Sequence, residues 1–173
     1  MKQARFFVTL FCGLLASCAL ADEAIHVDLA DVVSTGAVES VDGITSSGQP
    51  DLITLQIFAN SGYAAVIDMR GPDEDRGMDD EKSIVEGLGL DYVAFPVVGK
   101  ENISFEKAKA LDDILAGYDK PVLIHCGSGN RVGAVLALRE SLKGASDEEA
   151  LEYGKRAGMT RLEPLVTERL ESD

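Results

Sequence analysis

The 173-residue sequence has few of the side chains that commonly bind metals, with two histidines and three cysteines. Cys12 and Cys18 fall within the first 21 residues, so Cys126 is the only thiol in the rest of the chain. Because two histidines and one thiol do not form a recognisable ligand set, the sequence predicts no metal and no other cofactor. Cys126 also has no partner for an internal disulfide, so it can persist as a reactive group in an oxidising compartment.

Basic side chains are also scarce, with 16 Lys and Arg against 30 Asp and Glu, which gives a net charge of -14 at pH 7. This balance argues against a nucleic-acid partner, because nucleic acids are bound by basic patches. The same field repels polyanions at long range. It therefore favours a small anionic substrate, or a phosphate on a larger scaffold that makes other contacts. Solubility alone is an equally good reason for the acidity.

No apolar run is long enough to span a membrane, since the stretch at residues 6–16 falls short of the ~20 residues that a spanning helix needs. Two basic residues precede this stretch and small residues follow it, as in an export signal. Residues 19–21 (Ala-Leu-Ala) fit a cleavage site, which predicts export to the bacterial periplasm as a chain starting at Asp22. Residues 15–18 also resemble a lipobox, so we expect membrane contact only if Cys18 is lipidated.

The remaining part, residues 22–173, shows no repeats, low-complexity tracts or Pro-rich linkers. Its length suits one domain. Strand-like apolar segments alternate with segments of helical periodicity, which predicts an α/β fold with a mostly parallel sheet flanked by helices on both faces. We expect strands at residues 44–47, 63–69, 91–97 and 121–125, and helices at 50–62, 79–87, 105–117 and 132–142. Two capping boxes, Ser146 with Glu149 and Thr160 with Glu163, predict further helix starts.

The most informative segment is residues 121–133, in which an apolar run ends at Cys126 and a helix opens near Arg131. The four residues between them can point several backbone N–H groups inward, and the helix adds the positive end of its dipole. These groups and the guanidinium would stabilise a thiolate and an anionic ligand. The sequence therefore predicts cysteine chemistry on an anion held by the loop Gly127, Ser128, Gly129 and Asn130 together with Arg131. In a parallel sheet this loop lies at the carboxyl ends of the strands, where ligands gather.

Several polar residues near this loop have more than one possible role. His125 is either a core histidine or a functional residue, and in the second case a hydrogen-bonding support is preferred over a base. Ser128 and Asn130 either donate to a bound oxyanion or stabilise the turn. Asp68 and Arg70 end a neighbouring strand and could face the cleft, but a structural ion pair is the preferred interpretation.

Four segments of the chain together resemble a known family. These segments are Ser47-Gly48-Gln49-Pro50, residues 65–70, residues 92–97 and residues 125–134. They look like the bacterial phosphatase-like domain of beta-lactamase hydrolase-like proteins, which are relatives of the tyrosine and dual-specificity phosphatases. The resemblance implies that Cys126 is the nucleophile, that Arg131 binds phosphate and that His125 helps tune the thiolate. It also implies the fold of the cysteine phosphatases, in agreement with the sheet expected above.

The chain departs from the typical cysteine phosphatases in two ways. It has four residues instead of five between Cys126 and Arg131, and Val132 instead of Ser or Thr follows the arginine. This loop length is similar to that of rhodanese-type sulfurtransferases, and some members of the resembling family are labelled sulfur transferases. The resemblance also implies an acid after the strand at residues 91–97, but residues 98–104 contain no Asp. Glu101 is the nearest candidate on that loop, and Asp91 lies at the start of the strand.

Three functions follow, of which the first is preferred. One is a phosphatase-like hydrolase that acts on phosphate monoesters through a cysteinyl-phosphate intermediate. Another is a rhodanese-like sulfurtransferase that uses a Cys126 persulfide. The last is a non-catalytic module that binds oxyanions.

Overall fold

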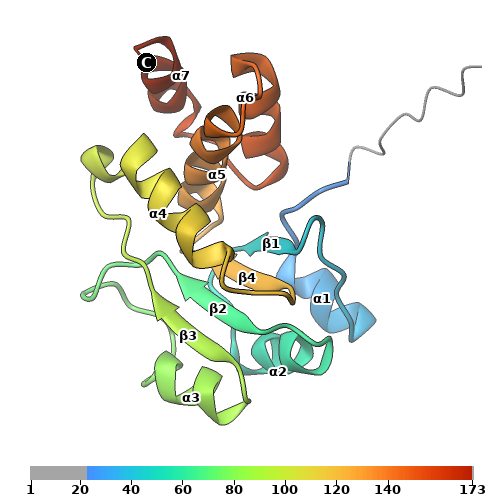
Figure 1. Ribbon diagram of the computed structural model, residues 1–173. Coiled ribbons are helices and arrows are strands. Elements are labelled where there is room, and N and C mark those ends of the chain that lie inside the picture. The colour runs from blue at the N-terminus through green and yellow to red at the C-terminus, as the bar shows by residue number, and fades with distance from the viewer. Residues whose placement is uncertain (1–22, 173) are drawn as a thin grey trace, which may run out of the picture.

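The computed structural model describes residues 23–172, which form a four-stranded sheet between two layers of helices (Figure 1). The sheet order is β1-β4-β2-β3, and every neighbouring pair is parallel. The strands are β1 (Ile44–Ser47), β2 (Ala65–Asp68), β3 (Asp91–Ala94) and β4 (Val122–His125). The predicted α/β fold with a mostly parallel sheet is therefore confirmed. The four expected strands are present, and β2 and β3 are shorter than expected.

Seven α-helices and one 3₁₀ turn are described. They are α1 (Leu29–Thr35), α2 (Leu52–Asn60), α3 (Glu81–Gly87), η1 (Lys100–Asn102), α4 (Phe105–Leu115), α5 (Asn130–Leu142), α6 (Asp147–Arg156) and α7 (Glu163–Glu171). The four helices expected from periodicity are confirmed within a few residues. The short helix α1 was not predicted.

Both predicted helix starts are confirmed, but only one of the two predicted capping boxes forms. Ser146 and Glu149 cap α6 reciprocally, each side chain accepting the backbone N–H of the other residue. Helix α7 begins at Glu163 without a side-chain cap. The Thr160 hydroxyl lies instead 3.1 Å from the side-chain oxygen of Asn130, to which the Thr160 backbone N–H donates at 2.7 Å. A tertiary partner has therefore replaced the local cap.

The two faces of the sheet carry separate apolar clusters, because side chains alternate along each strand. Val66 and Leu123 pack with α2 and α3 on one face, where α1 adds partly buried residues. Ile67 and Ile124 pack on the other face against α4, α5, α6 and α7. Figure 1 shows these four helices on one side of the sheet and α1, α2 and α3 on the other. Cys126 belongs to the cluster on the α4–α7 side.

Helices α5 and α6 approach each other closely at two glycines. A Cβ atom on Gly133 would lie 2.3 Å from the backbone nitrogen of Met159 and 2.4 Å from the backbone oxygen of Gly154. A Cβ on Gly154 would in turn lie 2.8 Å from the Gly133 oxygen. Because these are backbone atoms, no side-chain rotation relieves such contacts. The glycine pair therefore sets the position of α5, whose first turn carries Arg131.

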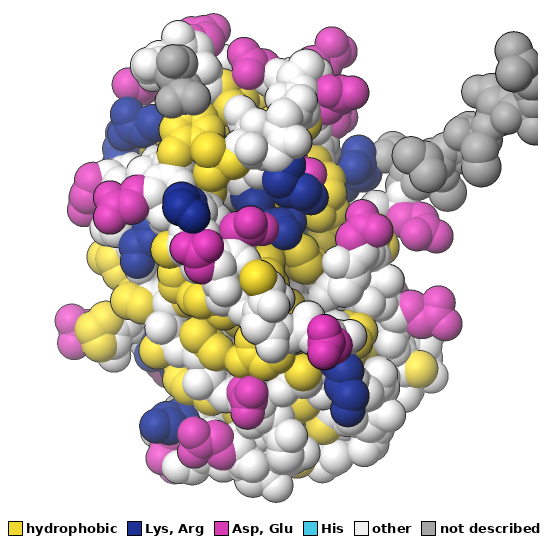
Figure 2. All heavy atoms as spheres, in the orientation of Figure 1, with side chains coloured by type: hydrophobic (Ala, Val, Ile, Leu, Met, Phe, Trp, Pro, Cys, Tyr) yellow, Lys and Arg dark blue, Asp and Glu magenta, His cyan; other side chains and the backbone are white. Residues whose placement is uncertain are grey.

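The predicted export signal at residues 1–21 and the lipobox at residues 15–18 lie outside the described residues. Within residues 23–172, none of the helices has both the length and the apolar character needed to cross a bilayer. Acidic side chains are spread over the face shown in Figure 2, and basic side chains are interspersed among them.

Candidate functional site

Cys126 follows β4 directly, and its side chain is 1% exposed. The next helix, α5, begins at Asn130, and its first backbone hydrogen bond runs from Gly133 to Gly129 at 2.9 Å. The N–H groups of residues 130–132 therefore have no acceptor within the helix. The cysteine thus lies one short loop away from a helix N-terminus that favours negative charge.

The conformation of this loop depends on glycine. Gly129 has a φ of 79°, in the left-handed region, and a Cβ there would lie 2.4 Å from the Cε1 atom of His26. On another side the loop meets the segment that follows β1, where Gly48 forms an isolated β-bridge with Ser128. A Cβ on Gly48 would lie 3.4 Å from the Gly127 oxygen. The Ser-Gly-Gln-Pro segment noted in the sequence is therefore a neighbour of the cysteine loop.

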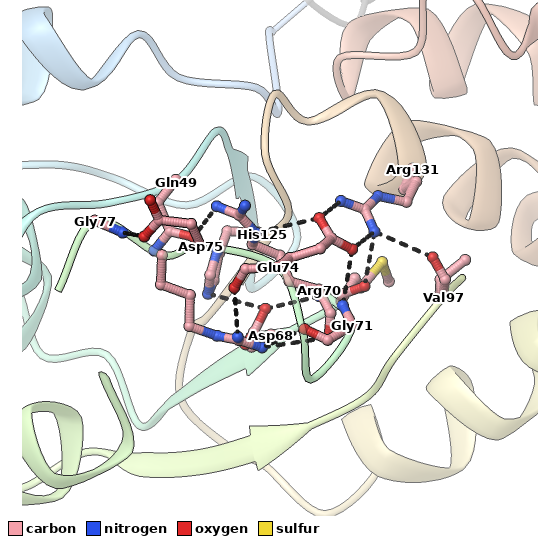
Figure 3. A network of polar contacts seen from close by, with 12 residues as sticks. Gln49, Asp68, Arg70, Gly71, Glu74, Asp75, Gly77, Val97, His125 and Arg131 are labelled. Carbon is pink, nitrogen blue, oxygen red and sulfur yellow. Dashed lines mark hydrogen bonds and ion pairs between the residues drawn. The ribbon is translucent and has the colours of Figure 1, made fainter. Parts of the chain in front are cut away.

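Glu74 holds the guanidinium of Arg131 through a bidentate ion pair, which Figure 3 shows. Nη1 and Nη2 of Arg131 each lie 2.6 Å from one carboxylate oxygen of Glu74. Nη1 also donates to the carbonyl oxygens of Val97 at 3.2 Å and Met69 at 3.4 Å. A pair of parallel charge-assisted bonds is strong and directional, so it fixes the orientation of the guanidinium.

The electrostatics of the pair place both groups in their charged forms near neutral pH. The Arg131 hydrogen bond lowers the pKa of Glu74 to about 2 against an opposing effect of burial, with help from the Gly71 N–H and the charges of Arg131 and Arg70. The pKa of Arg131 is raised, first by its hydrogen bond to Glu74, against an opposing effect of burial, and then by its coulombic interaction with Cys126. The guanidinium of Arg131 and the sulfur of Cys126 therefore lie close to each other.

A hollow of about 400 Å³ opens beside Arg131. Its wall combines apolar and charged side chains, and it is lined by Glu74, Val97, Val98, Gly99, Lys100, Ile103, Asn130, Arg131 and Leu162. Glu101 is exposed and does not line it, although a Cβ on the lining residue Gly99 would meet the Glu101 carboxylate. A larger hollow of about 630 Å³ lies at the other end of the sheet, beside Gly43 and Pro121, away from the cysteine loop.

The expected ion pair between Asp68 and Arg70 is wrong. The Asp68 carboxylate, which is fully buried, pairs with Arg76 at 2.7 Å and accepts the Tyr92 hydroxyl at 2.8 Å. From Arg70 the Asp68 carboxylate accepts just the backbone N–H, at 2.7 Å, in a turn that folds back on its own chain. The Arg70 side chain extends instead toward Glu74 and Gln49.

His125 lies behind the cysteine loop, on the face of the sheet opposite to Cys126. Its ring is fully buried, and Nε2 lies 3.0 Å from Oε1 of Glu81 and 3.7 Å from Oδ1 of Asp68. These three atoms form the one group of potential metal ligands among the described residues. The guanidinium of Arg76 lies against both carboxylates, 2.7 Å from Asp68 and 3.5 Å from Glu81, so the arrangement favours hydrogen bonding over metal binding.

Asn130 connects the cysteine loop to the segment between α6 and α7. Its side-chain oxygen accepts the backbone N–H groups of Thr160 at 2.7 Å and Leu162 at 3.3 Å. This oxygen therefore stabilises the start of α5. Ser128, by contrast, contributes a backbone contact, the bridge to Gly48.

Three important charged residues were not identified from the sequence. Glu74 and Arg76 come from the acidic segment between β2 and α3, and Glu81 opens α3 directly after it. Glu81 is 2% exposed although it is the first residue of α3. The one sequence feature that could have indicated them is the number of charged residues of both signs directly after a buried strand. Such a segment suggests ion pairs at the carboxyl end of the strand.

Known proteins resemble the chain in sequence and in structure. The family model described as the phosphatase-like domain of beta-lactamase hydrolase-like protein matches residues 39–143. A beta-lactamase hydrolase-like protein of Xylella fastidiosa (strain Temecula1) is 32% identical over 109 residues, which cover 61% of this chain and 25% of that protein. A second, from Agrobacterium fabrum, is 29% identical over 126 residues and covers 70% of this chain and 29% of that protein. The chain therefore spans about a quarter of the length of the curated relatives that it matches.

Among solved structures, a proposed phosphatase of Neisseria meningitidis Z2491 has a TM-score of 0.62 at 23% identity, covering 73% of this chain and 90% of that one. P. aeruginosa TpbA, solved in complex with phosphotyrosine, has a TM-score of 0.50 at 16% identity and covers 71% and 75%. At these identities the two likenesses show a shared fold.

Proposed function

Since the chain belongs to the family of beta-lactamase hydrolase-like proteins, as their phosphatase-like domain, we propose that it is a cysteine-dependent hydrolase of phosphate monoesters. The observation that carries the proposal is the guanidinium of Arg131, held by Glu74 beside Cys126 at the start of α5. A rigid cation and unpaired helix N–H groups are the groups that a transferring phosphoryl needs.

The reaction proceeds in two displacements. The Cys126 thiolate attacks phosphorus, a sulfur–phosphorus bond forms, and the bond to the leaving oxygen breaks. Arg131 and the N–H groups at the start of α5 stabilise the negative oxygens on phosphorus. Water then attacks phosphorus, which releases inorganic phosphate and returns the sulfur as a thiolate.

Glu101 is the proposed acid for the leaving oxygen. It lies on η1, and its carboxylate is close to Gly99 in the wall of the hollow beside Arg131. Glu74 is closer to the site, but its pKa of about 2 leaves it without a proton near neutral pH. A Glu101→Gln variant should lower kcat by about 10²-fold for substrates with a poor leaving group. The matched control is Glu106→Gln, which removes another exposed carboxylate from the start of α4.

The test of the main proposal is hydrolysis of an aryl phosphate such as para-nitrophenyl phosphate by the purified protein. We expect phosphate release by the wild type, and loss of at least about 10³-fold in kcat for Cys126→Ser. A wild-type protein that releases no more phosphate than Cys126→Ser would overturn the proposal.

Sulfur transfer is the second candidate, and the short loop favours it. Only four residues separate Cys126 from Arg131, and Cys126 is 1% exposed, so the loop could accommodate one outer sulfur atom in place of a phosphoryl group. In this reaction Cys126 accepts a sulfane sulfur from thiosulfate, releases sulfite, and passes the sulfur to a nucleophilic acceptor such as cyanide. Intact-mass measurement after thiosulfate treatment should then show one added sulfur that Cys126→Ser lacks. Binding of phosphate without either reaction would instead identify a non-catalytic oxyanion module.

Export to the bacterial periplasm is part of the proposal. It is supported by the charge and hydropathy pattern of residues 1–21. Fractionation of cells that express the full chain, with mass spectrometry of the N-terminus, tests it. A mature chain that begins at Asp22 fits soluble release, an acylated Cys18 fits a membrane anchor, and an uncleaved chain in the cytoplasm contradicts both.

A further inference from the structure

A continuous set of polar contacts runs from Arg131 to Glu81, and Figure 3 labels its members Arg131, Glu74, Arg70 and Gln49. From Arg131 it runs through Glu74 to Arg70, whose Nη1 donates to the side-chain oxygen of Gln49 at 2.7 Å. The Gln49 amide donates in turn to Oε2 of Glu81 at 3.2 Å. Glu81 therefore lies at the end of this path, against the ring of His125.

Both oxygens of Asp68 accept hydrogen bonds, whereas only one of the two oxygens of Glu81 does. Arg76, Tyr92 and the Arg70 backbone all donate to Asp68. Oε2 of Glu81 faces Gln49 and Arg76, but Oε1 has no hydrogen-bond partner in the described part of the chain. A buried carboxylate oxygen without a donor is costly, so this atom requires one.

His125 Nε2 is the nearest candidate donor. It lies 3.0 Å from Oε1 of Glu81, but the two atoms are not aligned as a full hydrogen bond. Neither atom has a hydrogen-bond partner among the residues described. A small rotation of the imidazole would direct an Nε2–H at Oε1. The titratable and charged groups around the ring are Asp68 on β2, Arg76 in the following loop, Glu81 on α3 and, through Asp68, Tyr92 on β3.

We propose that Glu81 is a positioning residue that accepts the Nε2–H of His125 and so fixes the tautomer and orientation of the residue that precedes Cys126. The tautomer of a histidine is set by the hydrogen bond that one of its nitrogens makes. The backbone oxygen of His125 accepts the Met69 N–H at 2.9 Å, where the strand passes into the cysteine loop. A fixed imidazole therefore holds the backbone of His125, from which the cysteine loop begins. The inference rests on the proposed role of Cys126 as the nucleophile.

The test uses Glu81→Gln, which keeps the size of the side chain and removes its charge. Gln49 and Arg76 both present N–H groups to Oε2, so the new amide will direct its oxygen toward them and its NH₂ toward His125. An NH₂ group there requires Nε2 to accept, which moves the imidazole proton to Nδ1. The matched control is Glu86→Gln, which removes an exposed carboxylate from the same helix.

Two measurements report the result without any phosphatase assay. Nitrogen-15 NMR of the imidazoles identifies the tautomer, and it is simple to assign because the chain has two histidines, of which His125→Asn removes one. Iodoacetamide alkylation of the Cys126 peptide, followed by mass spectrometry across a pH series, reports the reactivity of the thiol. We expect an Nε2–H tautomer in the wild type and an Nδ1–H tautomer in Glu81→Gln. At neutral pH we also expect Glu81→Gln to be alkylated at least about threefold more slowly, with no change in Glu86→Gln.

Several outcomes would overturn the inference. One is an unchanged tautomer or an unchanged alkylation profile in Glu81→Gln. Another is an equal effect of Glu81→Gln on the alkylation rate in the wild-type and His125→Asn backgrounds. If Glu81 acts through His125, Glu81→Gln should have no further effect once His125 is replaced by Asn. A stoichiometric transition metal in the purified protein, lost in Glu81→Gln, would make Glu81 a ligand instead. If the NMR and alkylation results are as expected but the protein does not hydrolyse aryl phosphate, only the proposed function is refuted.

Discussion

Among the arginine–carboxylate pairs at the carboxyl end of the sheet, two differ clearly in exposure. The side chains of Arg131 and Glu74 are 23% and 33% exposed, whereas those of Arg76 and Asp68 are 18% and 0% exposed. Arg131 and Glu74 line the hollow of about 400 Å³, so a ligand in the hollow can reach this guanidinium. A carboxylate removed from water depends on its partners for stability. We therefore expect ligand binding to depend on the first pair and folding stability on the second.

The sharpest test of this division is Arg131→Lys. A lysine keeps the charge but cannot make two parallel hydrogen bonds, so it cannot both pair with Glu74 and present a planar donor to phosphate. We expect kcat/KM for an aryl phosphate to fall by about 10³-fold, with little change in thermal stability. A lysine variant with wild-type kinetics would remove Arg131 from the site.

The opposite result is expected for the buried pair. Asp68→Asn removes the nearer of the two buried carboxylates that face Arg76, so the free energy of unfolding should fall by about 3 kcal/mol in urea denaturation. Arg76→Gln should lower the free energy of unfolding by a similar amount. The double variant should lose much less than the sum of the two single losses. A loss below about 0.5 kcal/mol would mean that this pair behaves like a surface ion pair.

Glu74→Gln tests the first pair from its acidic side. The amide still accepts one hydrogen bond from Arg131, so the guanidinium should remain nearby but be less well oriented. We expect kcat/KM to fall by about tenfold and the free energy of unfolding to change by less than about 1 kcal/mol. A larger effect on stability than on catalysis would reverse the division between the two pairs.

Tyr92→Phe removes one of the donors to Asp68, the hydroxyl at 2.8 Å, and leaves Arg76 in place. Deleting a single hydrogen bond to a buried charged group should lower the free energy of unfolding by about 1 to 2 kcal/mol. The pKa of Tyr92 is raised by burial and by its hydrogen bond to Asp68, so in the wild type the hydroxyl keeps its proton well into alkaline conditions. Unchanged stability would indicate that Arg76 alone satisfies the carboxylate.

The smallest expected effect is the acid dependence of the exposed pair. The pKa of Glu74 is lowered from 4.5 to about 2, so its stabilising contribution is present above pH 4.5 and is lost as the pH falls toward 2. The difference in unfolding free energy between wild type and Glu74→Gln should therefore be constant above pH 4.5 and shrink below it. A difference that persists unchanged at pH 2 would contradict the ion pair.

Local patterns in the sequence predicted the parts of the fold that depend on local physics. The strand before Cys126 and the helix after it follow from an apolar run and a glycine-containing turn, and both are found. The box at Thr160 and Glu163 failed because Asn130, thirty residues away in sequence, supplies the hydrogen-bond acceptor instead. Local propensity carries no information on such a partner.

The site was predicted less completely than the fold for the same reason. Cys126, Arg131 and the loop between them are contiguous, so their chemistry could be derived from spacing. The partners of these residues come from the acidic segment after β2, and which of its carboxylates turns inward depends on how α3 packs. The Asp68–Arg70 prediction failed because Asp68 turns back to the Arg70 backbone, which leaves its other oxygen to Arg76 and Tyr92.

The most direct test of the central claim is rapid acid quenching of the protein during turnover of an aryl phosphate, followed by peptide mass spectrometry. The account predicts one phosphoryl group on Cys126, formed and lost at rates that match turnover, and none on Cys126→Ser. Turnover without that adduct, or with the phosphoryl group on another residue, would contradict it.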